Sequence, residues 1–474
     1  MKKFITALLA CTMLLSASAC GNGTNNDDSG KTTISVMVYS AGYGMKWLEE
    51  TKRIYEESHD GVSVKISGDP LAFETVKTKL ENGNCKDDII LIGSEYYRTF
   101  VAKGYIEDLT DVYESDVEGR NKKVKDMVSA QIINTKTIND KLYGIPWQQN
   151  NGSGLIYNVK MFNQYGWKKP ETMKEFFELC EQIDADTNGA VSPLIFGGAD
   201  SRGYTDYNLC QWLCEYYGYD AMMQFLKLES PDAFAAQAEG RTKIYRTLAT
   251  LMHGKMSSGR PYAVDGSVGM TAITAQTNFV NGKVAMIING QWLPTEMDTY
   301  VKLRNFEMGY IPMPHINDDK KSGDGKEDTS DIRFSTDGNL MVIPSTSQHK
   351  EIAKDFLKYM FTEQSYTAFV KENNGLLRPF DNVAVNTQTF SDFAKEACEY
   401  FNLNGNARMV YQVSEQSVLE RGKIALFMAY GGGFFSRIGA CADYDAAIAC
   451  ADSCFGSELN SVKAVWDSAS GKWK

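Results

Sequence analysis

The sequence predicts an α/β fold with more than one domain, and three observations lead to this prediction. Segments with strand and helix character alternate through the first third of the chain. Residues 88–92 form a short apolar run that ends at Gly93, which is typical of a fully buried parallel strand. The chain of 474 residues is also too long for a single hydrophobic core.

In the first third of the chain, each predicted strand is followed by a predicted helix. β-branched residues mark the strands, and apolar residues at helical spacing mark the helices. In chain order, strand alternating with helix, the segments are 33–39, 42–58, 62–66, 72–82, 88–92 and 95–103. The turns at 39–45, 67–73 and 93–97 follow the three strands. They should meet at one rim of the sheet, where such folds bind ligands.

Beyond residue 140 the predicted structure becomes more helical. A polar stretch of Gln, Asn and Gly occupies residues 147–153. The other predicted elements are extended segments at 142–146, 154–158 and 306–314, strands at 284–289 and 339–344, a mostly helical region at 159–275 and an amphipathic helix at 350–361. The remainder of the chain is predicted to be mostly helical, and no internal repeat is found.

The first residues predict export from the cytoplasm. Two lysines precede a short apolar run, and small residues precede Cys20. The run is too short to cross ~30 Å of hydrocarbon, so residues 1–20 are predicted to be a lipoprotein signal peptide with Cys20 as the lipid anchor. Residues 21–31 are expected to form a flexible tether. The alternative is an ordinary secreted protein whose Cys20 falls near the cleavage site.

Composition narrows the class of protein. The formal net charge is −11 and there is no basic run, which excludes a nucleic-acid partner. Apolar residues make up 43% of the chain and aromatic residues 12%, enough for packed cores. We expect a monomer at the outer face of the cell membrane or in the periplasm.

The ten cysteines leave several possibilities open. Eight lie outside the leader, at positions 85, 180, 210, 214, 398, 441, 450 and 454. Two pairs, 210/214 and 450/454, stand four apart in helical stretches and are poorly placed to bridge to each other. Buried small side chains are the favoured interpretation, and disulfides are the alternative. No metal or other cofactor is expected, because the four histidines do not cluster near either pair.

Several segments together carry a family resemblance. They are Tyr-Gly-Ile-Pro at 143–146, Gly-Leu-Ile-Tyr-Asn at 154–158, Phe-Val-Asn-Gly-Lys-Val-Ala-Met at 279–286, Gly-Gln-Trp at 290–292, Gly-Tyr-Ile-Pro-Met-Pro at 309–314, Asp-Gly-Asn-Leu-Met-Val-Ile-Pro at 337–344, and the helix with Ala353, Phe356 and Leu357. In this order and spacing, they resemble the sugar-binding class of extracellular solute-binding proteins of ABC importers.

The resemblance implies a periplasmic-binding-protein-like fold of class II type, in which two α/β lobes joined by crossing strands close on a ligand. Carried onto this chain, lobe one is 32–146 plus 335–376, lobe two is 158–307 plus 381–474, and the hinge crossings lie near 147–157, 308–314 and 377–380. The extra length at the C-terminus and the cysteine content depart from simpler members of the family.

A sugar site needs aromatic rings for its C–H faces and polar side chains for its hydroxyls. The candidates are Trp147, Gln149 and Asn151 in the first crossing, Trp292 after a strand of lobe two, Phe434 and Phe435 after the glycine triplet, and Tyr43, Ser94 and Glu95 on the rim of lobe one. Trp292 occupies the position where sugar binders of this class commonly place a stacking ring.

Each candidate also has a structural explanation. Trp292 and the Phe434–Phe435 pair can be core residues, residues 148–151 can form a solvated turn, and Tyr43 can pack the first helix. Glu95 can face a helix dipole. Asp200, Arg202 and Tyr204 are further candidates for ligand contacts, but a surface loop is the preferred interpretation there.

The predicted function is the lipid-anchored substrate-binding component of an ABC importer that captures a carbohydrate and delivers it to the permease, without catalysis. A secreted glycoside hydrolase is one alternative, and it needs two carboxylates ~5–9.5 Å apart. No nucleophile elbow, metalloprotease motif or phosphate-binding loop is present in the sequence. A binding protein for a polyamine, a peptide or an anion is the other alternative.

Overall fold

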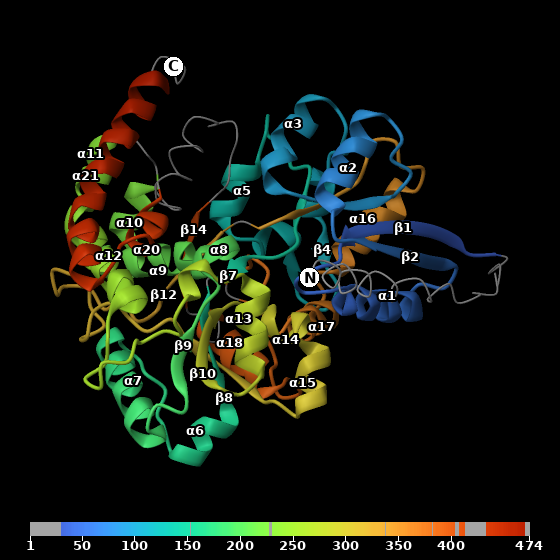
Figure 1. Ribbon diagram of the computed structural model, residues 1–474. Helices are drawn as coiled ribbons and strands as arrows, with labels where there is room; N and C mark the ends of the chain where they lie inside the picture. Colours follow the sequence, from blue (N-terminus) through green and yellow to red (C-terminus); the bar gives the residue numbers. More distant parts are fainter. Residues whose placement is uncertain are drawn as a thin grey trace, which may run out of the picture.

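In the computed structural model, the described residues form two lobes, each built on its own sheet (Figure 1). The structure describes residues 30–151, 153–226, 230–336, 338–381, 383–402, 407–412 and 433–469. The predicted signal peptide, Cys20 and residues 21–29 of the predicted tether lie outside these ranges. Within them, we find no helix with both the length and the apolar character that spanning a membrane requires.

The sheet of the first lobe has five strands in the order β2-β1-β3-β13-β6, and it confirms the predicted alternation of strands and helices. The strands are β1 (Thr32–Tyr39), β2 (Val62–Asp69), β3 (Ile89–Ile92), β6 (Ile145–Pro146) and β13 (Leu340–Val342). β1 lies parallel to β2 and β3, whereas β13 is antiparallel to β3 and β6. All four residues of β3 are buried, as expected for a central parallel strand.

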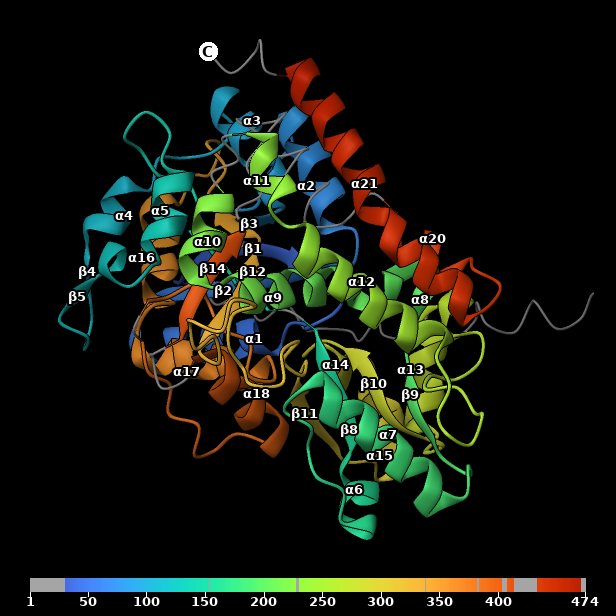
Figure 2. The ribbon, with the colours of Figure 1, turned by 90° about the vertical axis from the view of Figure 1, so that its left-hand side faces the viewer.

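Helices flank this sheet in both views of the ribbon (Figures 1 and 2). They are α1 (Lys46–Ser58), α2 (Ala72–Glu81), α3 (Tyr97–Ala102), α4 (Thr110–Glu114), α5 (Ala130–Lys136), α16 (Lys350–Tyr359) and α17 (Glu363–Glu372). Short elements complete the lobe: η1 (Ser94–Tyr96), η2 (Val124–Asp126), β4 (Asp116–Val117) and β5 (Lys122–Lys123).

The helix α1 begins four residues later than the sequence pattern predicts. Gly42 and Gly44 both take the left-handed backbone conformation, with φ of 66° and 69°, so this part of the segment cannot be helical. The chain between β1 and α1 therefore forms a loop at the carboxyl end of β1, and that loop carries Tyr43.

The sheet of the second lobe has the order β11-β8-β10-β9. Its strands are β8 (Gly154–Asn158), β9 (Ser192–Ile195), β10 (Val284–Asn289) and β11 (Met308–Pro312). β8 is antiparallel to β10 and β11. Two glycines of this sheet lie under aromatic rings: a Cβ on Gly309 would come within 2.2 Å of the Tyr157 ring, and one on Gly154 within 2.8 Å of Tyr310. This close packing explains why two of the motif segments begin with glycine.

Helices make up most of the second lobe. They are α6 (Val159–Tyr165), α7 (Met173–Thr187), α8 (Gly198–Ser201), α9 (Thr205–Tyr217), α10 (Tyr219–Phe225), α11 (Pro231–Ala235), α12 (Ala238–His253), α13 (Ala272–Val280), α14 (Leu293–Glu296), α15 (Asp298–Arg304), α18 (Asp392–Asn402), α20 (Phe434–Gly439), α21 (Tyr444–Ala469), η3 (Arg202–Tyr204) and η4 (Ser267–Gly269). The region predicted as mostly helical also contains β9, which pairs with β10 in parallel.

A third sheet, β14-β12-β7, lies where the chain passes between the lobes. β7 (Asn150–Asn151) lies on the way from β6 to β8, and β12 (Ile332–Thr336) on the way from β11 to β13. The two pair with each other in antiparallel fashion, and β14 (Arg408–Gln412) adds to β12 in parallel. Residues 308–312, where the sequence predicted a crossing, are a full strand of the second sheet, so the second passage between the lobes runs through β12.

Arg378 holds the third passage against the first. Its guanidinium is 1% exposed and donates to the carbonyl of Trp147 at 3.1 Å and to that of Met360 at 2.6 Å. It also stacks on the ring of Phe369, 4.0 Å from the centroid. Burial lowers the pKa of Arg378 to about 9. The guanidinium is thus bonded to backbone carbonyls.

The eight described cysteines are all free thiols. Six of them are buried in the cores, in line with the favoured interpretation, and Cys441 and Cys450 are partly exposed. Burial raises the pKa of the Cys180 and Cys214 thiols well above the usual value. Within the described ranges, no group of three or more His, Cys, Asp or Glu side chains is arranged to hold a metal ion.

A histidine and a glutamate form a buried pair in the second lobe. Nδ1 of His315 lies 3.7 Å from Oε2 of Glu215, and both side chains are less than a tenth exposed. Burial lowers the pKa of His315 to about 4 and raises that of Glu215 to about 8. Near neutral pH both groups are therefore uncharged.

The buried His315 should make the stability of this protein depend on pH. As the pH falls from 6.5 towards about 4, the unfolded chain protonates this histidine and the folded chain does not. Wild type should therefore lose roughly 3 kcal/mol of unfolding free energy over this window that His315→Gln does not lose. Urea unfolding at several pH values measures the difference between the two proteins. Parallel pH profiles would contradict the prediction.

Candidate ligand-binding site

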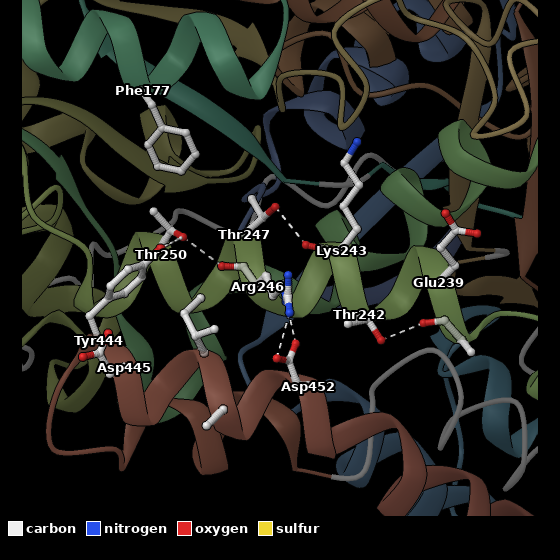
Figure 3. Close-up of a pocket in the computed structure, with 13 residues that line it drawn as sticks. Phe177, Glu239, Thr242, Lys243, Arg246, Thr247, Thr250, Tyr444, Asp445 and Asp452 are labelled. Atoms are coloured by element: carbon white, nitrogen blue, oxygen red, sulfur yellow. Dashed lines mark hydrogen bonds and ion pairs between the residues drawn. The ribbon is translucent and has the colours of Figure 1, made fainter.

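A groove of about 1130 Å³ lies between α12 and α21 of the second lobe, and Figure 3 draws the side chains that line it. Several of the polar groups that line it already have bonding partners within the protein. Arg246 makes two bonds to the carboxylate of Asp452, and Lys243 donates to Asn317 at 2.7 Å. The hydroxyls of Thr247 and its neighbours donate to carbonyls of their own helix. Because these groups have partners, this groove is a weaker candidate for the site than the region between the lobes.

Aromatic side chains of the two lobes meet beside the crossing segments. The ring of Tyr43 lies 6.1 Å from that of Trp292 and 6.5 Å from that of Trp147, edge to face in both cases. Tyr204 packs against the other side of the contact, 5.0 Å from Trp292. We call these four residues the interlobe aromatic cluster. It brings together a loop of the first lobe, the first crossing and two segments of the second lobe.

Local backbone features place these rings. Trp292 lies directly over Gly290, where a Cβ would come within 2.0 Å of the indole. Tyr204 has a φ of 54°, a conformation that bulky residues rarely adopt and that is concentrated at functional positions. Trp292 is partly exposed, whereas Trp147 is 2% exposed and packs against Trp47, with ring centroids 5.5 Å apart. Within the cluster, Trp292 is thus the indole that solvent can reach.

A carboxylate lies beside the cluster. Glu296, at the end of α14, accepts a hydrogen bond from the buried amide of Gln276 at 2.8 Å. The side chain is exposed to solvent, yet the surrounding protein raises its pKa. This combination fits a group that faces water but has protein on several sides.

The charge of Glu296 helps to raise the pKa of tyrosines in both lobes. Burial raises the pKa of Tyr39 and of Tyr43, and Glu296 adds to both rises. Burial also raises the pKa of Tyr204 to about 12, with a further rise from Glu296, while a hydrogen bond from Trp292 opposes it. A carboxylate thus lies among tyrosines from both lobes, next to a partly exposed indole.

Hydrogen bonds join the lobes next to this cluster. Asn374, which follows α17 in the first lobe, donates to the carbonyl of Gln291 and to the hydroxyl of Thr295, both at 3.0 Å. Gln291 in turn donates to the carbonyl of Asn374 at 3.2 Å. These bonds hold the segment of Trp292 against the first lobe.

Gln149 of the first crossing lies in a second polar environment. Its backbone N–H donates to the carbonyl of Leu377 at 3.0 Å, and its side-chain oxygen accepts from Tyr411 at 2.9 Å. It lines a cavity of about 230 Å³ together with Gln131, Tyr219, Tyr366, Asp381 and Arg408, among others. Burial raises the pKa of Asp381.

Ser94 and Glu95 follow β3, at the same end of the first sheet as the loop of Tyr43. Ser94 is buried and accepts a hydrogen bond from the buried ammonium of Lys136 at 2.9 Å. Glu95 is exposed. The backbone of Asn151 pairs with Ser335 in the third sheet, and its side chain lies outside what the structure describes.

Phe434 and Phe435 are placed in the core of the second lobe instead of on a binding surface. Phe434 is 1% exposed and stacks on Tyr245, with centroids 4.9 Å apart. Phe435 is 3% exposed and packs edge to face against Phe196. The amphipathic turn of α20 directs both rings inward, and the glycine triplet gave no signal that could distinguish a platform from a core turn.

The sequence-based prediction did not include Glu296, and it gave Tyr204 too little weight as a candidate for ligand contact. Glu296 follows Trp292 by four residues, which on one helical turn brings the two close together, and this spacing could have identified it. Tyr204 was assigned by preference to a surface loop. Its contact with Trp292 joins segments far apart in the sequence, and no local signal predicts such a contact.

Comparison with known proteins agrees with this fold. The profile of the bacterial extracellular solute-binding protein family matches residues 51–400. The chain therefore belongs to this family of extracellular binding proteins. A multiple sugar-binding protein of Streptococcus mutans is 24% identical over 325 residues, which cover 67% of this chain and 68% of the relative.

Two solved structures share the architecture. RafE in complex with raffinose has a TM-score of 0.56 and 19% identity, covering 90% of this chain and 100% of its own. The bacterial solute receptor AcbH, described as having an exclusive preference for β-D-galactopyranose, has a TM-score of 0.62 and 18% identity, covering 92% and 99%. These likenesses confirm the predicted periplasmic-binding-protein-like fold of two α/β lobes.

Proposed function

We propose that this chain is the carbohydrate-binding component of an ABC importer, which captures an oligosaccharide between its lobes and delivers it to the permease. The observation that carries the proposal is the interlobe aromatic cluster. A partly exposed indole, Trp292, lies beside a tyrosine from each lobe and next to the carboxylate of Glu296. Such a set offers a face for the C–H groups of a sugar and acceptors for its hydroxyls.

The proposed contacts are those of the cluster and its neighbours. Trp292 stacks on a sugar ring, while Tyr43 and Tyr204 border it and Glu296 accepts from hydroxyls. Trp147 supports the cluster from the first crossing, and Gln149, Asn151, Ser94 and Glu95 remain proposed contributors along the crossing and the first-lobe rim. Phe434 and Phe435 are left out, because the core covers their rings.

Closure of the lobes would supply affinity only if the ligand binds the closed form better than the open one. Contacts to one ligand from Tyr43 of the first lobe and Trp292 of the second meet that requirement. We place the lobes at 32–146 plus 335–376 and at 158–307 plus 381–474, joined by the three passages, and the second lobe also includes β8 and β11 at the two ends of its first segment. The proposal includes a monomer, anchored outside the cytoplasm through lipid on Cys20.

The names of the relatives support a sugar as cargo, since they include a multiple sugar-binding protein and a raffinose complex. Titration calorimetry with a panel of mono- and oligosaccharides tests the proposal, with a polyamine, a peptide and phosphate in the same panel. Saturable binding of a saccharide is the expected result. Binding of a non-sugar compound alone would overturn it.

The glycoside hydrolase alternative requires two carboxylates that face each other across the bond to be cleaved. Besides burial, Glu296 and Asp200 both raise the pKa of Tyr204, but Asp200 is not among the groups that shift the pKa of Glu296. An assay for reducing sugar released from the saccharide that binds tests for catalysis. We expect no turnover, and measurable turnover would favour the hydrolase.

Trp292→Ala should weaken saccharide binding by ~1–3 kcal/mol, roughly 5- to 150-fold in Kd, because a stacking face is lost. The melting temperature should change little, since the ring is partly exposed. Calorimetry and thermal unfolding measure the two effects. The matched control is Tyr444→Ala, which removes an aromatic ring, 40% exposed, from the groove of Figure 3. Equal losses in the two variants would contradict the assignment.

Glu296→Gln keeps the shape of the side chain and removes its charge. Charge-assisted hydrogen bonds are worth about 1–2 kcal/mol more than neutral ones, so binding should weaken roughly 5- to 30-fold. Asp445→Asn, an exposed acid that lines the groove between α12 and α21, is the control and should leave Kd unchanged. An unaltered Kd for Glu296→Gln would remove this carboxylate from the site.

A further inference from the structure

Three thiols meet near the start of α21, far along the chain from the residues of the proposed site. Sγ of Cys450 lies 3.8 Å from Sγ of Cys454 on the same helix. The thiol of Cys441, in the turn that precedes this helix, donates to the carbonyl of Arg437 at 3.3 Å, and its pKa is raised by burial and by the neighbouring Cys450. Cys450 thus lies beside both of the other thiols. We call Cys441, Cys450 and Cys454 the thiol cluster.

Geometry decides which of these contacts can become a covalent bond. Residues four apart on a helix have Cβ atoms about 5–6 Å apart, whereas a disulfide needs about 3.5–4.5 Å. Cys450 and Cys454 therefore cannot bridge without unwinding α21. Cys441 is not bound by this limit, because it lies in the turn between α20 and α21.

Exposure points to the same pair. Cys441 and Cys450 are partly exposed, whereas Cys454 and the other five described cysteines are buried. A disulfide oxidant in solution can reach the first two and not the rest. The family is extracellular, and disulfides form and persist in oxidising extracellular compartments.

We propose that Cys441 and Cys450 form a redox site that an extracellular disulfide oxidant converts to a disulfide bond, while Cys454 remains a thiol. One thiolate attacks a sulfur of the oxidant and releases one thiol. The second thiolate then attacks the mixed disulfide and releases the other. The protein loses two hydrogens and two electrons, and the oxidant gains both as two thiols.

The bond would fasten the turn before α21 to the helix itself. This end of α21 packs along α12 and borders the groove in Figure 3, where Tyr444 bonds to Thr250 at 3.1 Å. Figure 2 shows α21 lying alongside α12 at the edge of the second lobe. Oxidation is therefore expected to stabilise this helical edge, because the disulfide reduces the number of conformations that the unfolded chain can adopt.

The test incubates the purified full chain with oxidised glutathione and then blocks free thiols with an alkylating agent. The expected result is loss of the mass of two hydrogens, a Cys441–Cys450 crosslinked peptide in the non-reducing digest, and reversal by dithiothreitol. The melting temperature of the oxidised form should rise by a few degrees.

Variants separate the possible pairings. C441S and C450S should each lose the crosslink, and C454S should keep it, so C454S is the matched control on the same helix. A crosslink between Cys450 and Cys454 would overturn the proposal. A full set of alkylated thiols, or a stable glutathione adduct in place of the crosslink, would also overturn it.

Discussion

The antiparallel pairing of β7 with β12 is the constraint on which the arrangement of the two lobes depends. The two strands come from segments that connect the sheets in opposite directions, and Ser335 lies opposite Asn151 in the pair. The N–H of Trp147 adds a bond to the carbonyl of Asn339 at 3.0 Å, and Gln149 adds one to the third passage. Because the three passages are bonded together, the two lobes are joined along one side, and the loops on their facing edges lie close to each other.

The interlobe aromatic cluster is a consequence of this arrangement. Tyr43 follows a strand of the first sheet, and Trp292 follows a strand of the second, so each ring lies at a strand end. Trp147 lies in the passage itself, under Tyr43 and against Trp47. The buried indole of Trp147 thus supports the surface that presents the partly exposed indole of Trp292. Arg378 donates a hydrogen bond to the carbonyl of Trp147. Trp147 and Trp292 were both candidates for ligand contact in the sequence, and the structure separates them into a supporting ring and a proposed contact ring.

Two buried ionisable groups of the second lobe are kept neutral by their surroundings. Glu215 and His315 are close, but burial shifts the pKa of each towards its uncharged form. Glu296 differs, because its carboxylate is exposed while burial by its neighbours raises its pKa. An acceptor that is open to solvent and raises the pKa of nearby tyrosines can exchange water for the hydroxyls of a ligand without leaving a charge unpaired, which is why it is the polar centre of the proposed site.

The sequence by itself determined the fold class, the strand–helix alternation of the first lobe and the position of Trp292 after a buried strand, because each depends on local periodicity and composition. Only the tertiary structure decided which aromatic rings face solvent. Phe434 and Phe435 were candidates for ligand contact like Trp292, yet packing buried them against Tyr245 and Phe196. The contact of Tyr204 with Trp292 and the place of β9 in the second sheet were likewise decided at long range. Burial and contact depend on which distant segments pack together, and the spacing of residues along the chain does not determine which segments those are.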